Sequence, residues 1–209
     1  MRLYLSSYRI GAYADRLLGL SDGPRTALIP NALDGLPAGV RDAGLQRDLA
    51  DLGQLGLKVT ELDLRGPHAA ERLLGFDIVW VRGGNTFVLR RVMADTGTDH
   101  ALTDLVQRDA LVYAGYSAGA CVLAPDLSGL EAVDDITVVA NPLTTGLGWL
   151  DRPFVPHLRS PGHPETAACD AIAASYLAAG QAHWALRDGD VLVIDGGTTQ
   201  LLRSNSLMP

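Results

Sequence analysis

Short hydrophobic runs alternate with stretches of helical periodicity along most of the chain. The runs have the length and composition of buried strands, and the longer amphipathic stretches predict helices. The predicted strands are Arg2–Leu5, Thr26–Ile29, Lys58–Asp63, Asp77–Val81, Leu111–Ala114, Thr137–Val139, Phe154–Val155, Ala182–Leu186, Val191–Ile194 and Gln200–Leu202. The predicted helices are Val40–Leu55, Thr86–Met93, Asp99–Asp109, Ala118–Leu123 and Pro164–Ala179.

The order of these elements predicts the fold class. Strands alternate with helices in the first half, and the strands are hydrophobic almost throughout, which is typical of a parallel sheet that is covered on both faces. We therefore predict a three-layer α/β fold with a mainly parallel sheet, in a single domain over residues 1–209. The shorter strands near the C-terminus are expected to pair antiparallel at one edge. Residues 129–148 are the least regular region, and we expect surface loops near the functional site there.

Composition narrows the class of protein. The 209 residues are 47% hydrophobic and 20% charged, which is ordinary for a globular domain. The net charge of −7 argues against a nucleic-acid partner. Met1 leads directly into the first predicted strand, and no apolar stretch approaches 18 residues, so we expect a cytoplasmic protein without a membrane partner. Cys121 and Cys169 fit no zinc motif, and we expect no metal and no cofactor.

The segment Gly115-Tyr116-Ser117-Ala118-Gly119 follows the hydrophobic run that ends at Ala114. A strand that enters a tight turn with a serine at its apex holds the serine hydroxyl out of the sheet, where it can act as a nucleophile. The N–H group of Ala118 points the same way and can help to bind an oxyanion. The alternative is a glycine-rich turn whose serine has no chemical role.

A nucleophilic serine needs a base. Among the five histidines, His157 lies just after the predicted strand Phe154–Val155 and Pro156, at the C-terminal end of the strand, and this is the edge at which open α/β sheets place their sites. His163 begins the last predicted helix. His68 and His100 lie in polar, loop-like segments, and His183 lies in a predicted strand, where a structural role is expected.

A second glycine-rich segment, Arg82-Gly83-Gly84-Asn85-Thr86-Phe87, also follows a buried strand and opens a helix. Free N–H groups near a helix N-terminus favour an anion, which in a serine hydrolase is the tetrahedral oxyanion. The alternative is an ordinary helix N-cap that uses Asn85 or Thr86.

Taken together, these segments resemble a known family. Arg82 to Phe87, Gly115 to Ala120, Pro156-His157 and Gly162-His163-Pro164-Glu165-Thr166 occur in the order and spacing of peptidase E, and the similarity runs to about residue 197. Peptidase E is a family of serine peptidases on a class I glutamine amidotransferase-like scaffold, which is flavodoxin-like. The chain resembles a short member of it.

The resemblance implies roles for several residues. Ser117 would be the nucleophile, His157 the general base, and the N–H groups of Gly84 and Ala118 the oxyanion hole. We expect Asn85, Thr86 and Arg159 to contact the substrate, with Arg159 as a replacement for an arginine that the family uses. That arginine follows a Gly-Glu-Thr sequence in typical peptidase E and pairs with the N-terminal aspartate of its dipeptide substrates. Here Ala167 stands in its place, which argues against the typical Asp-X activity.

The third member of the triad is left open by the residues alone. The family carries a glutamate in a Leu-Pro-Glu-Gly segment, which corresponds here to Leu186-Arg187-Asp188-Gly189. Asp188 would therefore orient His157, although an Asp-Gly pair also forms tight hairpins. Asp134 and Asp135, in the loop after the nucleophile helix, are the other candidates.

The favoured function is a serine peptidase that acts on a small peptide or amide, as a monomer or homodimer. One alternative is an α/β-hydrolase esterase, whose order of nucleophile, acid and histidine would use Asp134 or Asp135. Another is a binding protein that kept the scaffold without the activity.

Overall fold

Strands and helices alternate along the chain in the computed structural model, which describes residues 1–205. The strands are β1 (Arg2–Ser6), β2 (Arg25–Ile29), β3 (Lys58–Glu61), β4 (Ile78–Val81), β5 (Val112–Tyr116), β6 (Phe154–Val155), β7 (Trp184–Ala185), β8 (Val191–Asp195) and β9 (Thr198–Leu202). The helices are α1 (Ala14–Leu20), α2 (Ala38–Gln54), α3 (Ala69–Arg72), α4 (Thr86–Thr96), α5 (Thr98–Gln107), α6 (Ala118–Cys121) and α7 (Thr166–Ala178). Four 3-10 turns complete the set: η1 (Asn31–Leu33), η2 (Leu73–Gly75), η3 (Leu130–Ala132) and η4 (Ile136–Val138).

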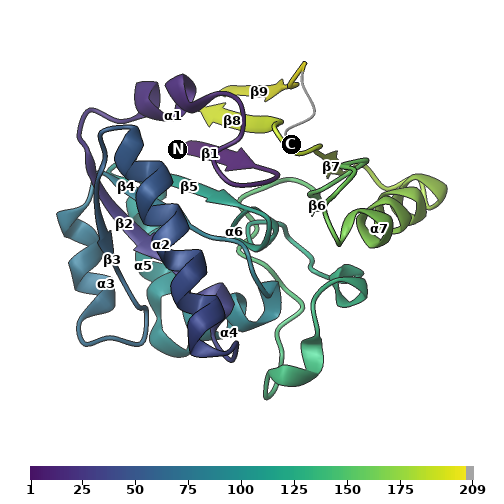
Figure 1. Ribbon diagram of the computed structural model, residues 1–209, viewed down its shortest axis with the longest axis horizontal. Coiled ribbons are helices and arrows are strands. Elements are labelled where there is room, and N and C mark those ends of the chain that lie inside the picture. The colour runs from purple at the N-terminus through teal and green to yellow at the C-terminus, as the bar shows by residue number, and fades with distance from the viewer. Residues whose placement is uncertain (206–209) are drawn as a thin grey trace.

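Seven of the strands form the main sheet, in the order β3-β2-β4-β5-β1-β8-β9 (Figure 1). The strands from β3 to β1 run parallel, whereas β8 pairs antiparallel with β1 and β9 pairs antiparallel with β8. A mainly parallel sheet with antiparallel C-terminal strands at one edge is the arrangement that the sequence predicts.

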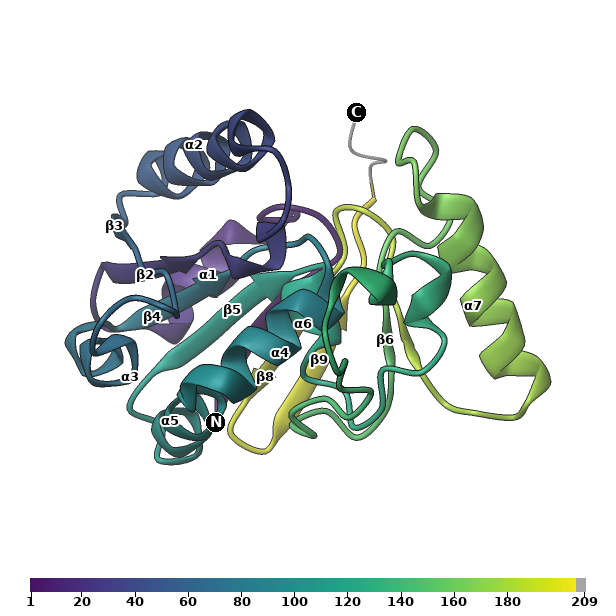
Figure 2. The same ribbon diagram turned by 90° about the horizontal axis from the view of Figure 1, so that it is seen from below.

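Helices cover both faces of this sheet, as Figure 2 shows: α1 and α2 lie on one side and α4, α5 and α6 on the other. The alternation of side chains along each strand explains this layering. In β4, Val79 and Val81 join the core under α4 and α5, whereas Ile78 and Trp80 join the core under α1 and α2. The three-layer α/β prediction is therefore confirmed.

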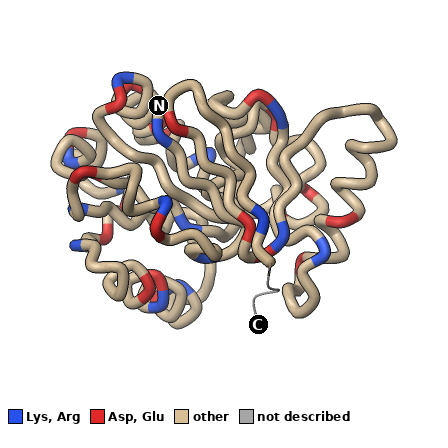
Figure 3. The backbone as a smooth tube through the Cα atoms, turned by 90° about the horizontal axis from the view of Figure 1, so that it is seen from above, with Lys and Arg blue, Asp and Glu red and all other residues tan. Residues whose placement is uncertain are grey.

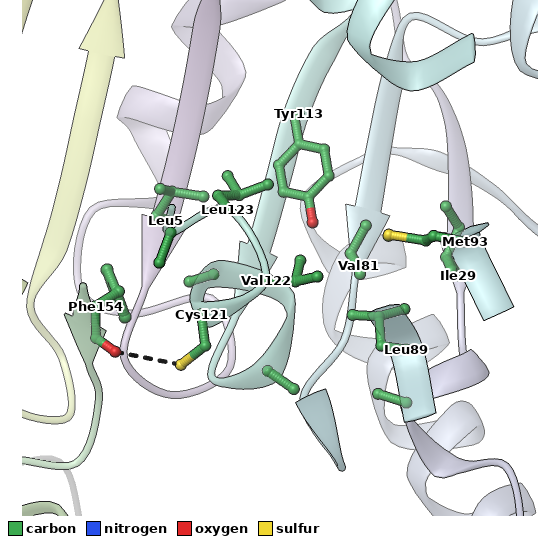
Figure 4. Close-up of a cluster of buried hydrophobic side chains, with 14 of the residues drawn as sticks. Leu5, Ile29, Val81, Leu89, Met93, Tyr113, Cys121, Val122, Leu123 and Phe154 are labelled. Atoms are coloured by element: carbon green, nitrogen blue, oxygen red, sulfur yellow. Dashed lines mark hydrogen bonds between the residues drawn. The ribbon is translucent and has the colours of Figure 1, made fainter. Parts of the chain in front are cut away.

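A small second sheet lies beside the main one and holds part of the functional site. Strands β6 and β7 pair in parallel, with Phe154 opposite Trp184 and Val155 opposite Ala185. The larger core connects this pair to the main sheet: in Figure 4, Cys121 of α6 faces Phe154, and its Sγ lies 3.5 Å from the Phe154 carbonyl oxygen. The sequence predicts both strands but not their pairing.

One predicted strand is wrong. Residues 137–139 form no strand, because η4 covers Ile136–Val138 and the Asp135 side chain caps it by accepting a hydrogen bond from the N–H of Thr137. Helices α1 and α3 were not predicted. The remaining predicted elements occur, with ends shifted by a few residues. Residues 129–148 are loops and two short 3-10 turns, as expected.

Charged residues of both signs are interspersed along the backbone (Figure 3). Within residues 1–205, no helix is both long enough and apolar enough to cross a membrane.

Candidate active site

Strand β5 ends at Tyr116, and Ser117 follows directly as the N-cap of α6. Ser117 has φ 49° and ψ −118°, a left-handed conformation that a serine adopts only when its surroundings enforce it. Such strain is common where a side chain is held ready for chemistry. The half-buried Ser117 hydroxyl therefore stands at the apex of a sharp strand-to-helix turn.

Close backbone packing enforces this turn. A Cβ atom on Gly119 would lie 2.1 Å from the carbonyl oxygen of Val81, so only glycine lets α6 approach strand β4 this closely. The hydroxyl of Tyr113 donates a 2.6 Å hydrogen bond to the Gly119 carbonyl from below. The turn is thus held by the main core of the molecule.

The second glycine-rich segment lies beside the serine. Gly84 has φ +149°, and a Cβ there would lie 2.4 Å from the carbonyl oxygen of Ala32. Asn85 caps α4, because its Oδ1 accepts hydrogen bonds from the N–H groups of Phe87 and Val88. In residues 1–205, the N–H groups of Gly84 and Ala118 donate to no protein acceptor, so both can serve an external oxyanion.

The parallel pairing of β6 and β7 brings His157 and Asp188 together. His157 follows β6 by two residues and Asp188 follows β7 by three, and the N–H of Leu158 donates to the carbonyl of Leu186 across the gap. Nδ1 of His157 lies 2.8 Å from Oδ1 of Asp188. The imidazole is buried, with 1% of its surface exposed, so this hydrogen bond holds the ring orientation and its tautomer.

Two serines support this pair. The hydroxyl of Ser7, just beyond β1, accepts a 2.7 Å hydrogen bond from the N–H of His157 and donates a 2.8 Å bond to Oδ1 of Asp188. The hydroxyl of Ser160 accepts a hydrogen bond from the N–H of Asp188. Burial alone would raise the pKa of Asp188, but His157 and the Ser7 hydroxyl outweigh it, and the pKa is lowered. Asp188 is therefore ionised near neutral pH.

Asp134 and Asp135 occupy different positions. The Asp134 carboxylate accepts a hydrogen bond from the N–H of Thr86, and burial raises its pKa to about 6. The exposed Asp135 side chain caps η4. Among the described residues, neither carboxylate forms a hydrogen bond or ion pair with His157. The geometry thus favours Asp188 over both as the partner of the base.

His163 stacks on His157. The two imidazole rings lie 3.5 Å apart between centroids and only 7° from parallel, and the ring of Tyr8 meets both of them edge-on. Burial, with the neighbouring His157, lowers the pKa of His163 to about 4. His163 is therefore neutral at ordinary pH and adds no positive charge beside the base.

These two histidines and Glu165 carry potential metal-ligand atoms that all lie within 4.8 Å of one another. An imidazole binds a metal in the plane of its ring. Because the two rings are nearly parallel and stacked, one ion cannot lie in both planes, and the cluster fits a metal poorly without a ring rotation.

A cavity of ≈ 530 Å³ joins these parts. Ser117, His157, Gly84 and Asn85 all line it. Thr86 is buried beneath the cap of α4 and does not line the cavity. Arg159 is exposed and lies against a separate hollow with Arg187 and Arg203, so the structure does not bring it to the predicted substrate.

A buried ionic cluster lies beside the cavity, and sequence reasoning missed it. Nε of Arg82 lies 3.2 Å from Oδ2 of Asp48, and its guanidinium donates a 2.9 Å hydrogen bond to the hydroxyl of Tyr116. Nε of Arg47 lies 3.9 Å from the other oxygen of Asp48. Two cations therefore share one buried carboxylate, and both line the cavity.

Ser7 and Tyr8 were also missed, although a signal for them exists. They follow β1 directly at the carboxyl edge of a parallel strand, the same edge that carries Ser117. A search of every residue that follows a predicted parallel strand would have included them.

Comparison with known proteins adds an independent finding. Residues 11–202 match the model of peptidase family S51. A "Peptidase E" of Streptomyces coelicolor is 36% identical over 149 residues, which is 68% of this chain and 54% of that protein. An uncharacterised peptidase of Listeria monocytogenes is 33% identical over 51% of this chain and 53% of its own length. The chain thus spans about half the length of the curated relatives it matches.

Solved structures show the same fold. A Listeria monocytogenes protein provisionally assigned to peptidase E superposes with a TM-score of 0.82 over 98% of both chains, at 22% identity. A peptidase from an acI-B1 actinobacterium superposes with a TM-score of 0.70 over 97% of this chain and 87% of its own, at 18% identity.

Proposed function

Because this chain belongs to peptidase family S51, we propose that it is a serine peptidase that cleaves a small peptide or amide through an acyl-enzyme on Ser117. One observation carries the proposal. Ser117 stands on a strained turn in the same cavity as His157, whose Nδ1 bonds to the ionised Asp188. Nucleophile, base and orienting acid are the three parts that serine hydrolysis requires.

In the first half of the reaction, the Ser117 hydroxyl oxygen attacks the carbonyl carbon of the substrate and gives its proton to Nε2 of His157. The carbonyl oxygen becomes an oxyanion and accepts hydrogen bonds from the N–H groups of Gly84 and Ala118. The intermediate then collapses. Nε2 returns the proton to the leaving nitrogen, the C–N bond breaks, and an ester to Ser117 remains.

In the second half, a water molecule gives a proton to Nε2 of His157 and attacks the ester carbon. The second intermediate uses the same oxyanion hole and collapses to the acid product, while the proton returns to the Ser117 oxygen. Asp188 keeps the proton on Nδ1 throughout and stabilises the imidazolium form. No step requires a cofactor.

The surroundings of the cavity suggest a small substrate. A volume of ≈ 530 Å³ suits a dipeptide or a compact amide. Typical Asp-X hydrolysis is expected to be weak, because Ala167 replaces the family's arginine and Arg159 points to another hollow. We propose a cytoplasmic monomer or homodimer, and the net charge of −7 disfavours a nucleic-acid partner.

The test compares four variants: Ser117→Ala, Asp188→Asn, Asp134→Asn and Asp135→Asn. A fluorophosphonate probe should label the wild type and not Ser117→Ala. Asp188→Asn should lower kcat by about 10³–10⁴-fold, because asparagine favours the wrong tautomer of His157. Asp135→Asn should remain active, and Asp134→Asn should keep most of its labelling rate.

The outcomes separate the three functions. Loss of labelling in Asp134→Asn or Asp135→Asn with retention in Asp188→Asn would favour the esterase arrangement. A wild-type protein that takes up no probe would favour a non-catalytic binding protein.

A further inference from the structure

Part of the cavity lining is apolar. Four side chains, which we call the apolar wall, form it: Leu33, Leu36, Val88 and Val138. Leu33 and Val88 are buried, whereas 47% of the surface of Leu36 and 63% of that of Val138 are exposed. The two exposed members can lose this surface to a bound ligand, and burial of apolar surface favours binding.

The position of the exposed members is what distinguishes them. Single exposed apolar residues are normal on a protein surface. Within residues 1–205, six large hydrophobic side chains are strongly exposed, and two of them, Leu36 and Val138, line the cavity that contains Ser117. A third, Val40, lines the hollow next to it, which shares Leu33 with the cavity.

The wall is anchored at the oxyanion side of the site. Helix α4 packs against both η1 and η4, which carry Leu33 and Val138. Asn85 fixes both contacts: its N–H donates to the carbonyl of Ala32 at 2.8 Å, and its Nδ2 donates to the carbonyl of Asp135 at 2.9 Å. Because Gly84 precedes Asn85, the apolar wall begins next to the expected oxyanion position.

The charges around the wall disfavour an acidic side chain. Four carboxyl groups line the cavity: Asp34, Asp134, Asp135 and Glu165. Asp34 is already paired with Arg65, which leaves three. Of the two cations there, Arg82 is paired with Asp48 and donates a hydrogen bond to Tyr116, whereas its buried Nη1 has no hydrogen-bond partner among residues 1–205. Arg47 is the remaining one, and it also lies close to Asp48. A substrate carboxylate would therefore meet more negative than positive charge.

We propose that the apolar wall binds an uncharged, apolar side chain next to the bond that Ser117 attacks. The protein then selects peptides that carry leucine, valine or methionine at that bond over peptides that carry aspartate. This inference rests on the proposed function, since it names the substrate class of the same cavity.

The experiment measures kcat/KM for Leu-Leu, Leu-Gly, Gly-Leu, Gly-Gly and Asp-Gly in the wild type and in Leu36→Ser and Val138→Ser. We expect the leucine peptides to be cleaved at least about ten-fold faster than Gly-Gly and Asp-Gly. Each wall variant should reduce this preference several-fold. Comparison of Leu-Gly with Gly-Leu shows which side of the bond meets the wall.

Leu74→Ser and Leu177→Ser are the matched controls. The side chains of Leu74 and Leu177 are 69% and 76% exposed, and neither lines the cavity. Each control variant therefore removes an exposed leucine that lies away from the cavity. They should keep the wild-type preference. Arg47→Gln is also measured. If the wild type prefers Asp-Gly and this variant loses that preference, the cavity recognises a carboxylate and the inference is wrong.

Two measurements separate this inference from the proposed function. Fluorophosphonate labelling reports the nucleophile without any peptide side chain. Titration calorimetry of Leu-Leu and Asp-Gly with Ser117→Ala reports binding without turnover. If the probe labels the protein but leucine and glycine peptides are cleaved at equal rates, the binding role of the apolar wall is wrong and the serine peptidase function is kept. If the probe does not label the protein, the serine peptidase function is wrong. Calorimetry then still tests the apolar wall, which predicts that Leu-Leu binds more tightly than Asp-Gly and that Leu36→Ser weakens the binding of Leu-Leu.

Discussion

The two halves of the site are built differently. Ser117 and the two N–H groups proposed to bind the oxyanion lie at the ends of β4, β5 and α6, whose backbones pack directly against one another within the main core. His157 and Asp188 follow two-residue strands of a separate small sheet (Figure 1). The Ser7 hydroxyl accepts a hydrogen bond from the N–H of His157 and donates one to Asp188, and the Ser160 hydroxyl accepts one from the N–H of Asp188.

Each half of the site is sensitive to a different kind of substitution. Backbone close packing fixes the nucleophile, so a single added carbon atom should displace it. Hydrogen bonds fix the base and acid, so the loss of one hydroxyl should loosen them while the fold survives.

The largest effect is expected from Gly119→Ala. The new Cβ would lie 2.1 Å from the carbonyl oxygen of Val81, and backbone atoms in a buried sheet cannot move aside cheaply. We expect a loss of about 3 kcal/mol in the free energy of unfolding. Displacement of Ser117 should also lower kcat by at least about 100-fold. Urea unfolding and probe labelling measure the two effects.

Gly53→Ala is the control for this substitution. Gly53 lies in α2, and a Cβ there meets no atom within 4 Å, so alanine should stabilise the helix by about 0.5 kcal/mol without affecting activity. Equal stability of the two variants would mean that the turn can relax, and the contrast between the halves would fail.

The turn that carries Ser117, which is held by backbone packing, can be predicted from the sequence. Glycines two residues either side of Ser117, after a hydrophobic run, specify a strand-to-helix turn by local sterics alone. The mainly parallel sheet can be predicted for the same reason, because hydrophobic strand patterns and the alternation of strands with helices are local signals. The residues alone leave the triad acid open between Asp188, Asp134 and Asp135, and the resemblance to peptidase E indicates Asp188.

The other half depends on contacts between distant segments. Nothing in Phe154-Val155 or Trp184-Ala185 indicates that these strands pair with each other, and that pairing is what brings Asp188 to His157. Ser7 reaches Asp188 across 181 positions of sequence. The strand predicted at 137–139 failed because its β-branched residues have no partner strand, so capping by Asp135 decides their conformation.

Ser7→Ala tests the hydrogen-bonded half. The variant leaves the N–H of His157 without its acceptor and removes a donor from Asp188. We expect kcat to fall by about 100-fold with little change in KM, because the base is misplaced and not the substrate. The unfolding free energy should fall by about 1–3 kcal/mol. Steady-state kinetics and urea unfolding provide the measurements.

Ser6→Ala is the matched control, because Ser6 is equally buried and adjacent, but its hydroxyl donates to the carbonyl of Arg9. It should cost stability without a comparable loss of kcat. A similar kcat in both variants would show that Ser7 supports the fold and not the base.

The smallest effect is expected at Asp134, and it depends on pH. Burial raises the pKa of this carboxyl from 3.8 to about 6, so above pH 6 the folded protein carries an unfavourable buried charge. Asparagine keeps the acceptor for the N–H of Thr86 and removes the charge. Asp134→Asn should therefore raise the unfolding free energy at pH 8, by on the order of 2 kcal/mol.

The sign of the effect follows from the order of protonation. As the pH falls from 6 towards 3.8, the folded wild type takes up the proton before the unfolded chain does, so the advantage of asparagine shrinks and disappears below pH 4. Asp135→Asn is the control, because the pKa of Asp135 is lowered by its hydrogen bonds to Thr137, and asparagine there should give no stabilisation at pH 8. Urea unfolding at pH 8, 6 and 4 measures both variants. An Asp134→Asn advantage that stayed constant with pH would mean that packing, and not the buried charge, sets the stability of this loop beside the base.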